Sequence, residues 1–179
     1  MAARAGAEAV ALELDVQYAT GSLAGLPARR SIESWVRAAL AGRRRGAQLA
    51  VRIVTEAEGR ALNERYRRRA GPTNVLSFPF EHSGRMRPPP LGDIVLCAPV
   101  VQREAAEQGK PARAHWAHLV VHGVLHLLGH DHENSREAEH MEELERKILA
   151  RLGYPDPYAS ERAVMRQNSK RQALTNERS

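Results

Sequence analysis

The chain has 179 residues, of which 42% are hydrophobic and 27% charged, with a net charge of +6. This length and composition fit one globular domain, and no stretch approaches the ~18 consecutive apolar residues of a membrane span. Residues 1–10 hold no apolar run that could act as a signal peptide, and the single cysteine, Cys97, cannot form an internal disulfide. A cytoplasmic protein is therefore expected.

Alternating apolar residues and capping signals predict the elements of the first half of the chain. The helix that follows the first strand is expected to begin at Ser31 as N-cap, and the next at the capping box of Thr55 and Glu58. Pro79 indicates that its strand lies at a sheet edge or ends irregularly. In chain order we expect a strand over 10–16, a helix over 31–40, a strand over 49–53, a helix over 55–65, a strand over 74–80, a loop over 81–90 and a strand over 93–97.

Three helices are predicted in the second half, over 99–108, 112–128 and 134–152, the last with Asn134 and Glu137 as its capping pair. Residues 1–158 are expected to form a single domain. The polar residues 159–179 lack periodicity and are expected to be a basic, disordered tail. The fold class is α/β (α+β), a small mixed four-stranded sheet packed with about five helices.

The segment HGVLHLLGHDH has the histidine spacing of a metal site. His122 and His126 are four residues apart and share one face of a helix, and Gly129 allows the chain to turn back and bring His132 to the same point. Three imidazoles leave one coordination position open, as in catalytic zinc sites. The alternative is that some of these histidines only pack and donate hydrogen bonds. His118 is expected to support the ligands or to be structural, because three consecutive helical turns spread too far to share one ion.

Neutral imidazole ligands favour zinc, with another first-row divalent metal as the alternative. The spacing is that of zinc metalloproteases, except that Gly123 stands where those enzymes carry their glutamate base. Peptide hydrolysis needs that base, whereas cleavage of a phosphodiester depends more on positioning and on neutralisation of charge. The site therefore suits a phosphodiester substrate better than a peptide.

Basic residues are concentrated in one part of the chain. Residues 41–69 contain nine arginines against three glutamates, with clusters at 43–45 and 67–69. The guanidinium group is a planar fork of donors that suits phosphate oxygens, so a polyanionic partner such as RNA is indicated. The alternative is a solubilising surface in a chain with 24 Arg and 3 Lys.

The sequence resembles a known family over about Leu49 to Tyr158. HGVLHLLGHDH is similar to HGxLHLxGYDH, the signature of the YbeY endoribonucleases, metal-dependent bacterial proteins of ribosomal RNA maturation and ribosome quality control. The likeness extends to LNERYRRRAGPTNVLSFPFE, to LGDIVLC and to EQGKPARAHWAHLVVHG. These motifs are long and specific.

The resemblance implies a zincin-like metal site in which His122, His126 and His132 hold one zinc ion. It implies that Arg67 is the catalytic arginine and faces the metal cleft. The implied activity is single-strand-specific endoribonuclease action in 3′-end maturation of 16S ribosomal RNA. The implied partners are ribosomal RNA, the small ribosomal subunit and ribosome-assembly proteins, with no membrane and no DNA. The nucleophile is left open between water and a ribose hydroxyl.

The chain departs from the family pattern at four positions. His130 replaces a tyrosine, so a fourth imidazole near the metal could compete for it or hydrogen-bond differently. Arg68 and Ala70 replace a glycine and an aspartate, which puts the conformation of that loop in question, and Asn74 replaces a frequent aspartate.

Two other functions stay open at this point. A non-catalytic ribosome-assembly factor could use zinc structurally and its arginines for docking. A metallopeptidase shares the histidine spacing but lacks a base at Gly123.

Overall fold

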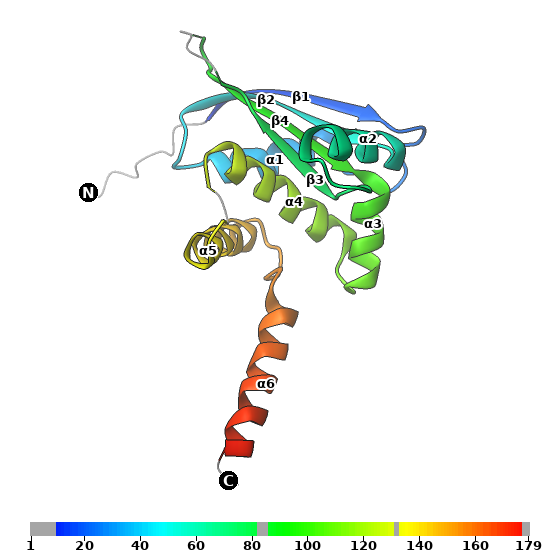
Figure 1. Ribbon diagram of the computed structural model, residues 1–179. Helices are drawn as coiled ribbons and strands as arrows, with labels where there is room; N and C mark the ends of the chain where they lie inside the picture. Colours follow the sequence, from blue (N-terminus) through cyan, green and yellow to red (C-terminus); the bar gives the residue numbers. More distant parts are fainter. Residues whose placement is uncertain (1–9, 82–85, 131–132, 177–179) are drawn as a thin grey trace, which may run out of the picture.

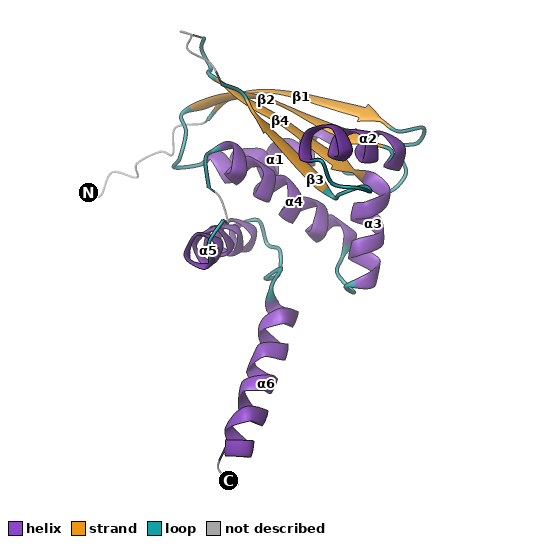
Figure 2. Cartoon of the chain, viewed as in Figure 1, coloured by secondary structure: helices purple, strands orange, loops and turns teal. Residues whose placement is uncertain are grey.

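A computed structural model describes residues 10–81, 86–130 and 133–176. Over these ranges the chain forms one four-stranded sheet and six helices (Figures 1 and 2). In chain order the elements are β1 (Ala11–Ala19), α1 (Arg29–Leu40), β2 (Gly46–Val54), α2 (Glu56–Arg67), β3 (Val75–Pro79), β4 (Pro90–Cys97), α3 (Ala98–Glu107), α4 (Ala112–Leu127), α5 (Ser135–Arg151) and α6 (Ala159–Asn176).

The sheet is mixed and has the strand order β1-β2-β4-β3. β1, β2 and β4 are parallel, and β3 pairs antiparallel with β4 at one edge. This confirms the predicted mixed four-stranded sheet and the edge position of the strand that contains Pro79. α1 and α4 cover one face, where Ile32, Trp35 and Val124 are buried against the strands (Figure 1).

The opposite face of the sheet is only partly covered, by α2 (Figure 1). Beneath α2 lies a smaller apolar cluster that contains Val54, Leu76 and Cys97. The Cys97 thiol is 2% exposed, and burial raises its pKa. The uncovered part of this face carries exposed acidic side chains, among them Asp15 and Asp93, beside a shallow hollow of about 710 Å³.

α5 lies on the side of α4 that faces away from the sheet, and α6 projects away from the rest of the fold (Figure 1). α5 buries three apolar side chains, Met141, Ile148 and Leu149, together with the carboxylate of Glu145. Among the described residues, no helix combines the length and the apolar character that crossing a bilayer requires.

The observed first residues of the helices can be compared with the predicted N-caps. Thr55 accepts a hydrogen bond from the Glu58 amide, and Asn134 accepts one from the Glu137 amide, so both are confirmed as N-caps. The Glu58 carboxylate, which was predicted to complete a capping box, instead accepts hydrogen bonds from Arg52. The prediction of Ser31 as N-cap is wrong. α1 begins at Arg29 with Ala28 as N-cap. The Arg29 guanidinium donates to the Leu14 carbonyl of β1 at 2.6 Å, which fixes the start of the helix earlier and leaves Ser31 buried in its first turn.

α6 occupies residues that were expected to be a disordered tail, so that expectation is corrected for 159–176. The physical reason is local. After Pro157 the segment contains no glycine or proline, and Ala, Arg, Gln, Glu, Lys and Leu are good helix formers. The division into a domain of residues 1–158 and a separate C-terminal segment stays a prediction.

Candidate functional site

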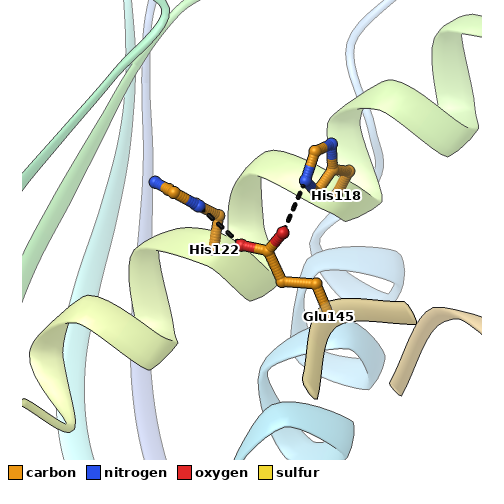
Figure 3. Close-up of side chains that lie close together, drawn as sticks. All are labelled: His118, His122 and Glu145. Carbon is orange, nitrogen blue, oxygen red and sulfur yellow. Dashed lines mark hydrogen bonds and ion pairs between the residues drawn. The ribbon is translucent and has the colours of Figure 1, made fainter. Parts of the chain in front are cut away.

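α4 carries four histidines through the middle of the fold and contacts α1, α3, α5, β3 and β4. Most of its other side chains are apolar and buried, so neighbouring elements hold the helix on most of its sides. His118 and His122 project from α4 toward α5 (Figure 3). The predicted glycine stop is confirmed, because Gly129 has a φ of +89° and the His130 amide donates to the Leu125 carbonyl.

Gly123 lies where α4 packs against β4. A Cβ atom at this position would stand 3.0 Å from Cγ2 and 3.1 Å from Cδ1 of Ile94, which is buried in the sheet. Zinc metalloproteases carry their glutamate base at this place in the motif. The tight contact between α4 and β4 disfavours a side chain here, because Ile94 would have to shift to admit it, and this gives the missing glutamate a structural reason.

A cleft of about 820 Å³ opens between β3, the end of α2 and the C-terminal half of α4. It brings together three of the four residues that were singled out in the sequence: Arg67, His122 and His126. The rings of His122 and His126 lie edge to face with centroids 4.6 Å apart. His132, the fourth of these residues, lies outside the described residues.

Arg67 is the last residue of α2, and the following residue, Arg68, turns the chain with a φ of +52°. Arg67 is exposed, and its Nη2 donates to the Ser77 carbonyl of β3 at 3.4 Å. The Ser77 hydroxyl in turn donates to the Gly123 carbonyl of α4 at 3.4 Å. β3 therefore connects the arginine with the helix that carries the histidines.

Glu145 of α5 is fully buried and fixes the orientation of His122 (Figure 3). Its Oε1 lies 2.6 Å from His122 Nδ1, and its Oε2 lies 3.0 Å from His118 Nε2. Burial raises the pKa of the Glu145 carboxyl, but the hydrogen bonds from His118 and His122 outweigh burial and lower it to about 2. An ionised carboxylate can only accept hydrogen bonds, so His122 Nδ1 carries the proton and Nε2 carries the lone pair.

His118, His122 and Glu145 form a candidate metal-binding group, since one ligand atom of each lies within 4.8 Å of the others. The same atoms are at hydrogen-bond distance, and the Tyr158 hydroxyl also donates to Glu145 Oε2. An ion placed directly between them would have to displace these bonds. The geometry matches that of carboxylate–histidine pairs in which the carboxylate orients an imidazole whose other nitrogen can bind a metal.

His130, which replaces the family tyrosine, also lines the cleft. Its ring lies 5.8 Å from the ring of His140 on α5. Burial, His140 and Arg43 lower the pKa of His130, which favours a neutral imidazole. Arg69 and Asn74 line the cleft as well.

Glu145 and Tyr158 were not predicted from the sequence as parts of the site. Glu145 stands four residues from Met141 and from Leu149, both of which are buried, so it falls on the apolar face of its helix. A carboxylate in such a stripe signals a buried partner and could have been found. No comparable signal marks Tyr158, because its role depends on how the segment after α5 folds back onto α4.

The chain is similar to curated proteins called endoribonuclease YbeY. It is 63% identical to the protein of Alkalilimnicola ehrlichii over 155 residues, which cover 84% of this chain and 93% of that protein. It is 57% identical to the proteins of Xanthomonas campestris and Stenotrophomonas maltophilia over 157 residues, which cover 86% of this chain and 97% of each protein.

The fold is also similar to the solution structure of TM1509 from Thermotoga maritima. The two structures have a TM-score of 0.51, and the match covers 84% of this chain and 92% of the other. Because their sequences are only 24% identical, the similarity supports the fold alone. The family model described as endoribonuclease YbeY matches residues 24–153, a range that contains Arg67, Glu145 and the histidines of α4. The chain belongs to the YbeY endoribonuclease family.

Proposed function

We propose that this protein is a metal-dependent endoribonuclease that cuts single-stranded RNA in the cleft between β3 and α4, in 3′-end maturation of 16S ribosomal RNA. The observation that carries the proposal is the meeting of Arg67, His122 and His126 in one cleft. Membership of the YbeY family supports the activity and the substrate class. The small ribosomal subunit and its assembly proteins are the expected partners.

The proposed metal ligands are His122, His126 and His132. Two features of the described residues suit them to a metal: the adjacent rings of His122 and His126, and the Glu145 carboxylate that puts the lone pair of His122 on Nε2. Imidazole ligands favour zinc, with another first-row divalent metal as the alternative. A bound ion would supply concentrated positive charge beside the scissile phosphate.

The chain's own residues then bind and orient the RNA. The Arg67 guanidinium offers several N–H donors at the mouth of the cleft and would bind the scissile phosphate and stabilise the added charge of its transition state. Arg69, which also lines the cleft, would hold a neighbouring phosphate. The position of Arg67 at the end of α2, bonded to β3, aims it at the same space as the histidines.

The other candidate functions differ in what they require of these residues. A metallopeptidase needs a base where Gly123 packs on Ile94, so the packing argues against it. A non-catalytic assembly factor needs metal binding and docking but no catalytic arginine. It predicts that the Arg67→Ala protein still associates with ribosomes and that the parent cuts no RNA.

The test is cleavage of a 16S RNA 3′-end fragment by the parent protein and by identically purified variants, with mapping of the new ends. We expect His126→Ala to abolish cleavage and Arg67→Ala to slow it by about 100-fold or more. Arg60→Ala is the matched control, an exposed arginine of the same helix that does not line the cleft, and it should cut like the parent.

Equal cleavage by the parent and His126→Ala would reveal a contaminating nuclease. Cleavage by neither protein, on both the fragment and intact small subunits, would favour the assembly factor. A parent that cuts at the 3′ end while Arg67→Ala cuts equally fast would refute the role given to Arg67.

A further inference from the structure

Glu145 is the buried centre of a hydrogen-bond network that extends beyond the residues matched by the family model, which end at 153. Oε1 accepts from His122, whereas Oε2 accepts from His118 and from Tyr158. We infer that Tyr158 is a positioning residue: through Glu145 it holds His122 in the orientation that binds metal. This inference rests on the metal site proposed above.

The division of the carboxylate into two sides supports this role. Glu145 has no exposure to water, so its negative charge must be satisfied by the groups around it. Among the described residues, Oε1 accepts only from His122, at 2.6 Å, and the two donors on Oε2 hold the carboxylate in the orientation that allows this bond. Removing a donor from Oε2 leaves part of a buried charge without a partner, so the carboxylate would lose its fixed orientation.

His118 helps to hold the Glu145 carboxylate in place, and it is not among the described residues that line the cleft. Its Nε2 lies 3.0 Å from Glu145 Oε2 and 3.2 Å from the Tyr158 hydroxyl, and its ring packs edge to face on the Tyr158 ring with centroids 5.3 Å apart. Burial and the Glu145 carboxylate raise the pKa of the Tyr158 hydroxyl well above its ordinary value, so the hydroxyl stays protonated and donates.

The segment that carries Tyr158 is itself fixed against the start of α4. Lys110 donates to the carbonyl of Pro157 at 2.7 Å, and the Tyr158 amide donates to Asp156 Oδ1 at 2.9 Å. Pro157 is buried. These contacts hold the segment in place, and the segment in turn positions the Tyr158 hydroxyl against Glu145.

This network predicts that the Tyr158 hydroxyl contributes to metal affinity without touching the metal. Losing a group that supports a metal-binding histidine commonly weakens metal affinity by about 10- to 100-fold. Tyr158 acts one step further away than Glu145. We therefore expect about a tenfold loss for Tyr158→Phe and a larger loss for Glu145→Gln.

The experiment measures the zinc dissociation constant of the full chain by competition with a chromophoric chelator, for the parent, Tyr158→Phe and Glu145→Gln. Tyr154→Phe is the matched control. Tyr154 lies in the same segment and its hydroxyl accepts hydrogen bonds from Trp35 and Arg113, but it is not bonded to Glu145. It should lose stability without losing zinc affinity.

A second readout separates positioning from general loosening of the fold. Cobalt(II) replaces zinc in such sites, and its visible absorption reports the geometry of its ligands. The Tyr158→Phe spectrum should differ from that of the parent, while Tyr154→Phe should match it. Thermal unfolding of the metal-free proteins shows that each variant is folded at the temperature of the measurement.

The failures of the two proposals are distinguishable. Stoichiometric zinc binding by the parent with an equal dissociation constant and an equal cobalt spectrum for Tyr158→Phe would overturn the positioning role and leave the metal site standing. A parent that binds no zinc or cobalt in the cleft would overturn the metal site, and the positioning role with it. Equal losses in Tyr154→Phe and Tyr158→Phe would also overturn the specific role of Tyr158.

Discussion

Single residues set the shape of the cleft. Gly123 allows α4 to lie against Ile94, and this contact places the two cleft histidines beside β3. Arg68 ends α2 in a left-handed conformation at the position where the family pattern has glycine. For an L-residue with a side chain this backbone conformation costs steric energy, and for glycine it does not.

Replacing Arg68 with glycine should therefore stabilise the protein, by about 0.5 to 1 kcal/mol after the entropy lost by glycine on folding is included. Urea unfolding of the metal-free chain measures this difference. Arg69→Gly is the control, because Arg69 is equally exposed but has no left-handed backbone, and its replacement should lower stability. A lower stability for both variants would contradict the assignment of strain to Arg68.

At the level of elements, the ends of helices were predictable where a side chain caps its own backbone. Thr55 and Asn134 are such cases, since the signal lies within four residues. Ser31 failed because the start of α1 is set by a bond from Arg29 to the distant β1. The same limit explains the site. The spacing of the histidines lies within one short segment and could be read from the sequence. The hydrogen bond between Glu145 and Tyr158, in contrast, forms only when α5 and the following segment fold onto α4.

Glu104 of α3 joins three elements and gives their packing a pH dependence. It accepts hydrogen bonds from His115 of α4 at 2.9 Å and from Asn74, just before β3, at 3.0 Å. Burial raises the pKa of the Glu104 carboxyl, but these bonds outweigh burial and the net shift is downward from 4.5. Because the folded-state pKa is depressed, this stabilisation is present above about pH 4.5 and is lost as the pH falls through the folded-state pKa.

Glu104→Gln should therefore unfold more easily than the parent at pH 7, by about 1 kcal/mol, and the difference should shrink as the pH falls below 4.5. Urea unfolding at a series of pH values tests this. Glu107→Gln, at an exposed position of the same helix, should show no such convergence. A gap between parent and Glu104→Gln that stays constant with pH would argue that the carboxylate charge is not what joins these elements.

At the scale of the whole molecule, positively charged side chains lie next to the cleft and negatively charged ones lie on the uncovered face of the sheet. The turn between α1 and β2 carries Arg44 and Arg45, both exposed, and the adjacent Arg43 is close enough to His130 in the cleft wall to affect its pKa. A strand of RNA that leaves the cleft past His130 would meet these arginines. The uncovered face of the sheet, with Asp15 and Asp93, has the opposite sign and would repel RNA.

RNA binding should therefore weaken steeply as salt rises, because each bound phosphate releases counterions. Removing Arg44 and Arg45 together should lower the slope of log affinity against log salt by about 1.4, since each phosphate of a single strand that an arginine neutralises adds ~0.7 to the slope. Fluorescence anisotropy with a single-stranded RNA at several salt concentrations measures the slope. The double replacement of Arg103 and Arg136, exposed on α3 and α5, should leave it nearly unchanged. Equal slopes for the parent and the Arg44/Arg45 variant would remove this turn from the RNA path.

The buried position of Cys97 has a practical consequence for following these events in solution. The thiolate is the form of cysteine that reacts with maleimides and oxidants, and a 2% exposed thiol with a raised pKa offers little of it. The chain has no other cysteine. A cysteine introduced on the exposed surface of α6, for example at Arg166, would therefore be the single reactive thiol. One dye could then be attached there without first removing a native residue from the core.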